Sequence, residues 1–128
     1  MSNGECEMMR LCKAAHKRKE QMVNETPLLS VGMKIETDSA LDKEYVVITM
    51  KEGGEERGVE FIENDSTFFT EAKARRHVDI LKKGLCLGIV VPERSFDLVL
   101  GLKSMLRNQE LRNPAFFVYD EAGNVKTV

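Results

Sequence analysis

Apolar residues near the N-terminus recur at the spacing of one helical face. At 100° per residue this pattern predicts a helix over residues 5–23. Lys19 falls inside the apolar stripe, so the stripe is narrow. We therefore expect residues 1–26 to form an amphipathic helix that docks either on the rest of the domain or, as a peripheral element, on a partner. The stripe consists of Met8, Leu11, Cys12, Ala15 and Met22.

Three β-rich segments follow this helix. Residues 31–35 alternate between apolar and polar positions with a period of two, which is typical of a strand with one wet face. Residues 45–51 are rich in β-branched side chains, and residues 57–62 alternate again. Gly53 and Gly54 separate the last two segments, which favours a hairpin. The three segments predict an antiparallel meander.

The second half of the chain alternates between helical and β patterns. Thr70 is a good N-cap for a helix that ends at Lys82-Lys83-Gly84, since cations and a C′ glycine favour a helix C-terminus. The continuous apolar run 85–91, stopped by Pro92, predicts a strand buried on both faces. A second helix from Ser95, a strand over 115–119 and a short edge strand over 125–128 complete the pattern.

These elements predict one α/β (α+β) domain over residues 1–128 with the order αβββαβαβ(β). Helical crossovers make the third, fourth and fifth strands parallel, so the sheet is mixed. A chain of 128 residues with 42% apolar composition can bury a sizeable core as one domain. The apolar run 85–91 is far shorter than the roughly 20 residues that span a bilayer. We expect no membrane partner.

Cysteine usage indicates a reducing compartment. Cys6, Cys12 and Cys86 are an odd number without a paired framework, and no secretory leader precedes them. The sequence therefore predicts a cytoplasmic protein in which Cys86, inside an apolar run, is buried and inert. Cys12 and His16 lie four residues apart on one helix, but a structural zinc site needs four ligands. We expect no metal site and no cofactor there.

Charge is unevenly distributed along the chain although its net value is only −2. Residues 36–66 contain three basic and ten acidic groups, and residues 67–112 contain nine basic and five acidic groups, so the first segment is −7 and the second is +4. If these segments pair between subunits, a homodimer would weaken as salt screens charges beyond about 10 Å at 0.1 M.

The outer arc of the helix after Thr70 predicts a binding surface. Four cations share that arc on a helical wheel and form what we call the basic ridge: Arg75, Arg76, Lys82 and Lys83. Clustered cations of this kind suit a nucleic-acid backbone or an acidic protein. Asp79 interrupts the ridge, however, and no glycine-rich phosphate loop or interleaved aromatic pattern accompanies it. An ordinary solvated helix face is the alternative.

The order helix, three strands, helix, strand resembles that of restriction-endonuclease-like proteins, including archaeal Holliday junction resolvases. The resemblance is one of topology and implies a site in which carboxylates hold Mg²⁺ beside a lysine and a water molecule is positioned for attack. The candidates here are Asp38, Glu44 and Glu60, with Lys73 from the following helix as the lysine. The third strand reads Glu60-Phe61-Ile62, so the Glu-x-Lys motif of that family is not met. His77 has no recognisable nucleophile or acid partner, and we assign it no catalytic role.

Three functions remain open. The favoured hypothesis is a non-catalytic interaction or regulatory domain that binds a protein or nucleic-acid partner, because no complete catalytic set is present. The second is a magnesium-dependent nuclease or its inactive relative. The third is a small-ligand sensor, whose ligand would lie beyond the carboxyl ends of the parallel strands, near residues 92–95 and 119–121.

Overall fold

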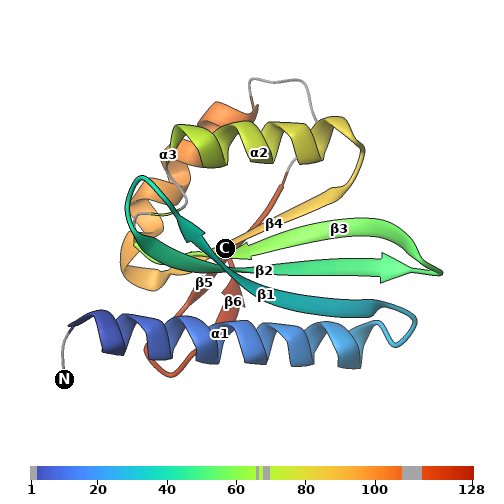
Figure 1. Cartoon of the computed structure of the whole chain (residues 1–128), viewed down its shortest axis with the longest axis horizontal. Coiled ribbons are helices and arrows are strands. Elements are labelled where there is room, and N and C mark those ends of the chain that lie inside the picture. Colours follow the sequence, from blue (N-terminus) through green and yellow to red (C-terminus); the bar gives the residue numbers. More distant parts are fainter. Residues whose placement is uncertain (1–2, 66, 68–69, 108–113) are drawn as a thin grey trace.

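The computed structural model describes residues 3–65, 67, 70–107 and 114–128, and it contains one mixed sheet with helices on both faces (Figure 1). The element order is the predicted one. The elements are α1 (Asn3–Glu25), β1 (Ser30–Asp38), β2 (Lys43–Glu52), β3 (Glu55–Ile62), α2 (Glu71–Lys82), β4 (Cys86–Pro92), the 3₁₀ turn η2 (Glu93–Ser95), α3 (Phe96–Arg107), β5 (Ala115–Tyr119) and β6 (Val125–Thr127).

The six strands lie in the order β1-β2-β3-β4-β5-β6. β1, β2 and β3 are antiparallel neighbours, which confirms the meander, and β3, β4 and β5 are parallel. β6 returns antiparallel to β5. The β2–β3 hairpin turns at Gly53 and Gly54, whose φ angles of 57° and 83° lie in the left-handed region that glycine adopts most easily. The sequence-based fold class is therefore confirmed.

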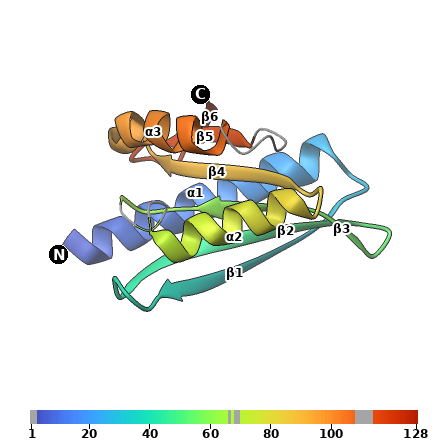
Figure 2. The ribbon, with the colours of Figure 1, turned by 90° about the horizontal axis from the view of Figure 1, so that it is seen from above.

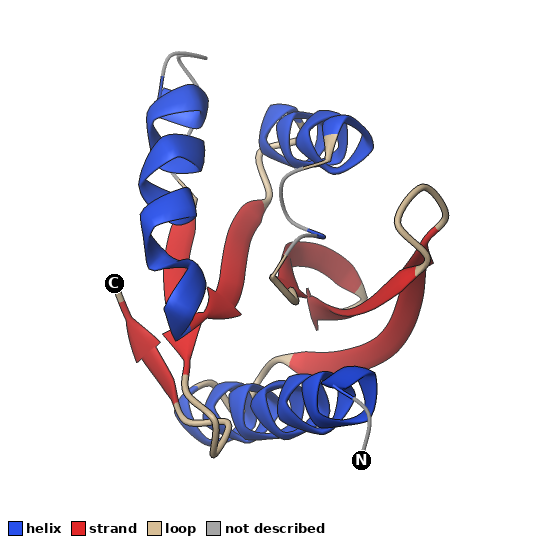
Figure 3. Ribbon diagram, turned by 90° about the vertical axis from the view of Figure 1, so that its left-hand side faces the viewer, coloured by secondary structure: helices blue, strands red, loops and turns tan. Residues whose placement is uncertain are grey.

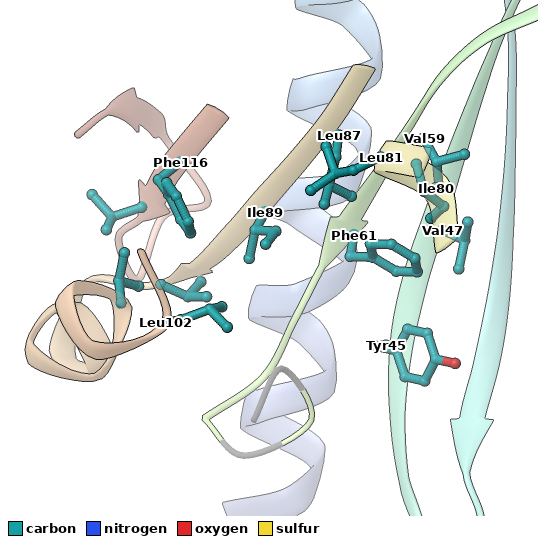
Figure 4. Close-up of a cluster of buried hydrophobic side chains, with 13 residues drawn as sticks. Tyr45, Val47, Val59, Phe61, Ile80, Leu81, Leu87, Ile89, Leu102 and Phe116 are labelled. Carbon is teal, nitrogen blue, oxygen red and sulfur yellow. The ribbon is translucent and has the colours of Figure 1, made fainter. Parts of the chain in front are cut away.

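The sheet separates two apolar cores. Figure 3 shows α1 on one face and α2 and α3 on the other. Side chains alternate across each strand, so Phe61 faces α2 whereas Ile62 faces α1. The core under α2 and α3 is drawn in Figure 4, where strand residues such as Ile89 meet Leu81 and Leu102 from the two helices.

Helix α1 packs along the sheet. Leu11, Ala14 and Ala15 are fully buried, and Met22 closes the same core near the end of the helix. Of the two placements expected from sequence, docking on the domain is the observed one, and the peripheral placement is not. The narrow stripe is sufficient because Arg18, which lies between the apolar positions, also points inward and pairs with Glu60.

Two sequence-based expectations about β4 and the membrane have clear outcomes. Cys86 is exposed, so the prediction that it is buried was wrong; it is the first residue of β4, where the strand emerges at the rim of the sheet. Burial begins with the next residue, Leu87.

Among the described residues, no helix combines the length and the apolar character needed to cross a membrane.

Candidate functional site

The four residues expected for a nuclease-like centre are divided between the two faces of the sheet. Asp38 and Lys73 lie on the α2 face, because Thr70 at the start of α2 donates to Asp38 Oδ2 over 3.3 Å and Lys73 belongs to α2 itself. Glu60 lies on the α1 face, where Arg18 binds it. Glu44 is exposed, and its backbone carbonyl accepts a hydrogen bond from Asn64. The structure therefore does not bring the predicted set together.

Glu60 is enclosed in the α1 core. It is buried, and Arg18 binds both carboxylate oxygens, with Nη2 donating to Oε2 over 3.1 Å. Burial raises the pKa of Glu60, and the guanidinium opposes that shift. The facing residue of β4 is Gly88, where a Cβ would lie only 2.6 Å from the carboxylate. Glycine therefore makes the room that this ion pair occupies.

Lys73 forms a second buried ion pair, on the α2 face. Its Nζ donates to Glu63 Oε1 over 2.6 Å and lies 3.2 Å from the centre of the Tyr45 ring. The two side chains are only 3% and 0% exposed. Burial raises the pKa of Glu63 and lowers the pKa of Lys73, while each partner opposes the shift of the other. The two charges are thus closed off from solvent and directed at each other.

His77 is buried one turn further along α2. Its ring packs 5.2 Å from the ring of Phe61, and neither nitrogen has a hydrogen-bond partner in the described part of the chain. Burial lowers its pKa to about 3, with the nearby cations Lys73 and Arg76 adding to the effect. The imidazole is therefore neutral at physiological pH and enclosed in the core under α2.

The basic ridge is less exposed than the helical wheel predicts. Arg76 leans onto the sheet, where it donates to both oxygens of Glu36 over 2.8 and 3.1 Å. Arg75 is exposed but is paired with Glu71 on the same helix. Lys82 and Lys83 are exposed at the end of α2. On the helical wheel the inner face of this helix is apolar and the cations lie on the outer arc. In the structure, α2 buries Lys73 and His77 together with Ile80 and Leu81, and this rotation turns Arg76 toward β1.

A cleft of about 560 Å³ opens at the carboxyl ends of β4 and β5. We call it the strand-end cleft. A smaller pocket shares Arg10, Pro92 and Arg94 with it and continues to Asn64, after β3. This is the position that the sensor hypothesis predicted. The cleft is lined by Arg10, Pro92, Glu93, Arg94, Asp120, Glu121 and Ala122.

The walls of the cleft come from segments far apart in the sequence. The turn between β5 and β6 lies against α1 in both Figure 1 and Figure 3. The approach is close at Gly123, where a Cβ would lie 2.7 Å from Cβ of Lys13, and Lys17 donates to Asn124 Oδ1 over 2.8 Å. Asp120 accepts backbone hydrogen bonds from Ala122 and Asn124 and so fixes the turn. The cleft is thus built into the fold.

Arg94 is held rigidly at the cleft. Its Nε donates to both oxygens of Asp65 over 2.7 and 2.9 Å, its Nη2 also binds Asp65, and the hydroxyl of Ser95 donates to the same carboxylate over 3.0 Å. Arg94 lowers the pKa of Asp65. A second acid, Glu7 of α1, lies 3.6 Å from Nη2. The charge of Arg94 is therefore already compensated by the protein.

Arg10 differs from Arg94 in its side-chain contacts. It is half-buried and lines both the cleft and the adjoining pocket. Across residues 3–65, 67, 70–107 and 114–128 it has neither an ion pair nor a hydrogen bond from its side chain. Helical periodicity gave no signal for Arg10, since a cation off the apolar face of a helix normally faces solvent.

No family model, curated protein or solved structure matches this chain. Among the described residues, no group of three or more His, Cys, Asp or Glu side chains is placed to hold a metal ion. The function must therefore be argued from the geometry of the site.

Proposed function

We propose that this chain is a non-catalytic regulatory domain that binds a small zwitterionic ligand in the strand-end cleft. The single observation that supports this proposal best is the guanidinium of Arg10, which has no ion pair or side-chain hydrogen bond among the described residues, at a cleft formed by the carboxyl ends of parallel strands. Ligands of open α/β sheets bind at such strand ends. A charged side chain that the fold leaves without a partner is available to a ligand.

The charges around the cleft suggest the chemistry of the ligand. Arg10 can bind a carboxylate or phosphate through two parallel hydrogen bonds. Glu93 and Glu121 are exposed on the rim, whereas Asp120 is committed to its turn. The two rim carboxylates can bind an ammonium group. A molecule with one acidic and one basic group, such as a free amino acid, therefore complements the cleft better than a simple anion does.

The lining of the cleft favours binding over chemistry. The described lining residues include no Ser, Cys, His or Lys that could act as nucleophile or as a base near neutral pH. Glu63 and His77, whose pKa values burial shifts, are not among the residues that line the cleft. Ligand binding at the junction of α1, η2 and the β5–β6 turn would instead restrain these three segments together.

Thermal unfolding with a ligand panel tests the proposal. The panel contains the twenty amino acids, with acetate, phosphate and ethylamine as probes that offer only one sign of charge. A ligand at 100 times its Kd stabilises the folded state by about 2.7 kcal/mol. We expect at least one amino acid to raise Tm, and the single-charge probes to have little effect. A shift with phosphate alone would indicate a simple anion site and contradict the zwitterion proposal.

Matched variants locate the binding. Arg10→Gln removes the uncompensated cation, and we expect it to abolish the shift. Arg57→Gln is the control, since Arg57 is an exposed arginine on the β2–β3 hairpin with only loose surface contacts. An equal loss of binding in both variants, or unchanged binding in both, would show that the ligand does not bind in the strand-end cleft.

Nucleic-acid binding by the basic ridge is the competing hypothesis. Lys82 and Lys83 remain exposed at the end of α2, so the same protein is titrated with single-stranded, duplex and branched DNA at low and moderate salt. We expect weak binding at most. Tight, salt-sensitive binding that the Lys82→Glu, Lys83→Glu double variant abolishes would place the function on α2 instead.

A further inference from the structure

Strand β1 forms one border of the sheet. All nine of its residues pair with β2 in an unbroken register, from Ser30 opposite Lys51 to Asp38 opposite Lys43. In the described part of the chain no strand pairs with its other side, as Figure 2 also shows. The border contains no proline and no bulge, two of the devices that usually protect a sheet edge. It is therefore competent to pair with another strand.

The side chains of this border are unusual for a solvated edge. Ile35 is 53% exposed in the middle of β1, and Leu28, just before the strand, is 79% exposed. Lys34 is 71% exposed and reaches Glu36 of the same strand over 3.4 Å. Glu36 keeps its negative charge, because the Arg76 hydrogen bond lowers its pKa to about 2. Along β1, the apolar residue Ile35 thus stands between the oppositely charged residues Lys34 and Glu36.

We propose that β1 pairs antiparallel with β1 of a second copy of this chain, with Ile35 opposite Ile35 at a twofold axis. Opposite residues of an antiparallel pair point to the same face and interact directly. In this register Lys34 of each copy lies opposite Glu36 of the other, so two ion pairs form on the α2 face of the sheet and the Ile35 pair lies on the α1 face. Residues 32–38 of both strands face each other.

Lys34 determines the register. A pairing centred on residue 34 would place two lysines opposite each other, and one centred on Glu36 would oppose two carboxylates. Like charges directly opposite each other are unfavourable. A pairing centred on Met33 would place Glu36 opposite Ser30 and Lys34 opposite Gly32, so neither residue would face an opposite charge on the partner strand. The register centred on Ile35 is therefore the one in which both charges of the strand are matched.

A second copy explains this pattern better than an unrelated peptide does. The sequence Lys34-Ile35-Glu36 is complementary to itself when reversed, which is the property that a twofold interface requires. An unrelated strand could pair with β1 by complementing only Lys34 or only Glu36. The dimer would join two six-stranded sheets into one continuous sheet and leave the strand-end cleft, formed by β4 and β5, outside the interface.

Sedimentation equilibrium over a range of protein concentrations tests the association. Lys34→Glu places Glu opposite Glu36 twice, and we expect it to weaken the dimer at least tenfold. The control is Lys126→Glu in β6, which makes the same charge change in an exposed residue of the opposite border strand. A monomer at millimolar concentration would overturn the proposal. So would a dimer that Lys126→Glu dissociates and Lys34→Glu does not.

Disulfide trapping tests the register independently. The variants are made in a background where Cys6, Cys12 and Cys86 are changed to Ser, so that only the new thiols can react. Ile35→Cys should crosslink to itself, because opposite Cα atoms of an antiparallel pair lie about 4.5–5.5 Å apart, within the range of a disulfide.

Two further variants distinguish this register from others. Met33 lies opposite Thr37 in the proposed dimer, so Met33→Cys and Thr37→Cys should each stay monomeric under oxidation, while an equimolar mixture of the two should crosslink. Self-crosslinking of Met33→Cys that is as fast as that of Ile35→Cys would contradict the register. Failure of all these variants to crosslink would exclude β1 as the interface.

Discussion

The charged groups under α2 and those at the strand-end cleft differ in how far they are enclosed and paired. Under α2, Lys73 and Glu63 are enclosed and bound to each other at 2.6 Å. At the cleft, Arg94 is compensated by Asp65, but Arg10 lines open space with no partner among the described residues. Burial is the main cause of the shifted pKa values of the enclosed pair under α2, whereas Arg10 lines a cleft that is open to solvent.

This difference separates two kinds of variant. Changes to the enclosed groups should reduce stability, because a buried charge without its partner is costly. Changes to the open groups should leave stability unchanged and affect binding only. The variants described next test this separation, from the largest expected effect on unfolding to the smallest.

Lys73→Met should have the largest effect. It leaves the carboxyl group of Glu63 buried without its partner, and we expect a loss of about 3–5 kcal/mol in the free energy of unfolding. Urea denaturation measures this loss. The double variant Lys73→Met, Glu63→Gln should be more stable than Lys73→Met alone, since it removes the buried charge. Purely additive effects would contradict the coupling of the two residues.

Gly88→Ala should be the next most disruptive change. The new Cβ would lie 2.6 Å from the Glu60 carboxylate, which Arg18 holds in place, and overpacking of this kind costs about 1–3 kcal/mol. Gly101→Ala in α3 is the matched control, because among the described residues nothing beyond its chain neighbours and the backbone of its own helix lies within 4 Å of the Cβ position. We expect that control to be neutral or stabilising. Equal stability of the two variants would mean that Glu60 is free to move.

His77 should make stability depend on pH. Its pKa is about 3 in the folded protein against an ordinary histidine pKa of 6.5, so the unfolded chain takes up a proton first as the pH falls. This contribution to stability is present above pH 6.5 and decreases as the pH falls from 6.5 toward 3.

The variant His77→Leu should lose this part of the pH dependence. We also expect it to be at least as stable as the wild type at pH 5, since both ring nitrogens lack partners among the described residues. Denaturation at pH 7 and pH 5 provides the comparison. An unchanged pH dependence in the variant would show that His77 is accessible to protons in the folded state.

Arg10→Gln should have the smallest effect on stability. Its side chain has no partner in the described part of the fold, and surface changes of this kind usually stay within about 0.5 kcal/mol. Thermal unfolding without ligand measures this. A large destabilisation would mean that Arg10 is a structural residue, and the contrast between the cleft and the α2 face would fail.

Local signals in the sequence predicted the elements well. Gly53 and Gly54 mark the hairpin, and Thr70 caps α2 by accepting from the backbone of Lys73. The apolar run that Pro92 ends is β4. These features depend on residues close together in the sequence, so the pattern is sufficient to predict them.

The long-range pairs could not be predicted in this way. Glu63 follows β3, and its partner Lys73 lies ten residues later on a helix whose wheel suggests a different buried face. Arg18 and Glu60 are 42 residues apart. Arg10 reaches the cleft only because α1 lies beside the β5–β6 turn. Each of these placements depends on tertiary packing, for which helical or strand periodicity contains no signal.

The most direct test of the central claim is an amide ¹H–¹⁵N NMR spectrum recorded with a mixture of the twenty amino acids and, separately, with duplex DNA. We predict that the amino acids shift the amide signals of Arg10, Arg94 and Glu121 around the strand-end cleft, and that DNA leaves them unchanged. Shifts confined to α2, or a spectrum that no amino acid alters, would contradict the assignment of function to the cleft.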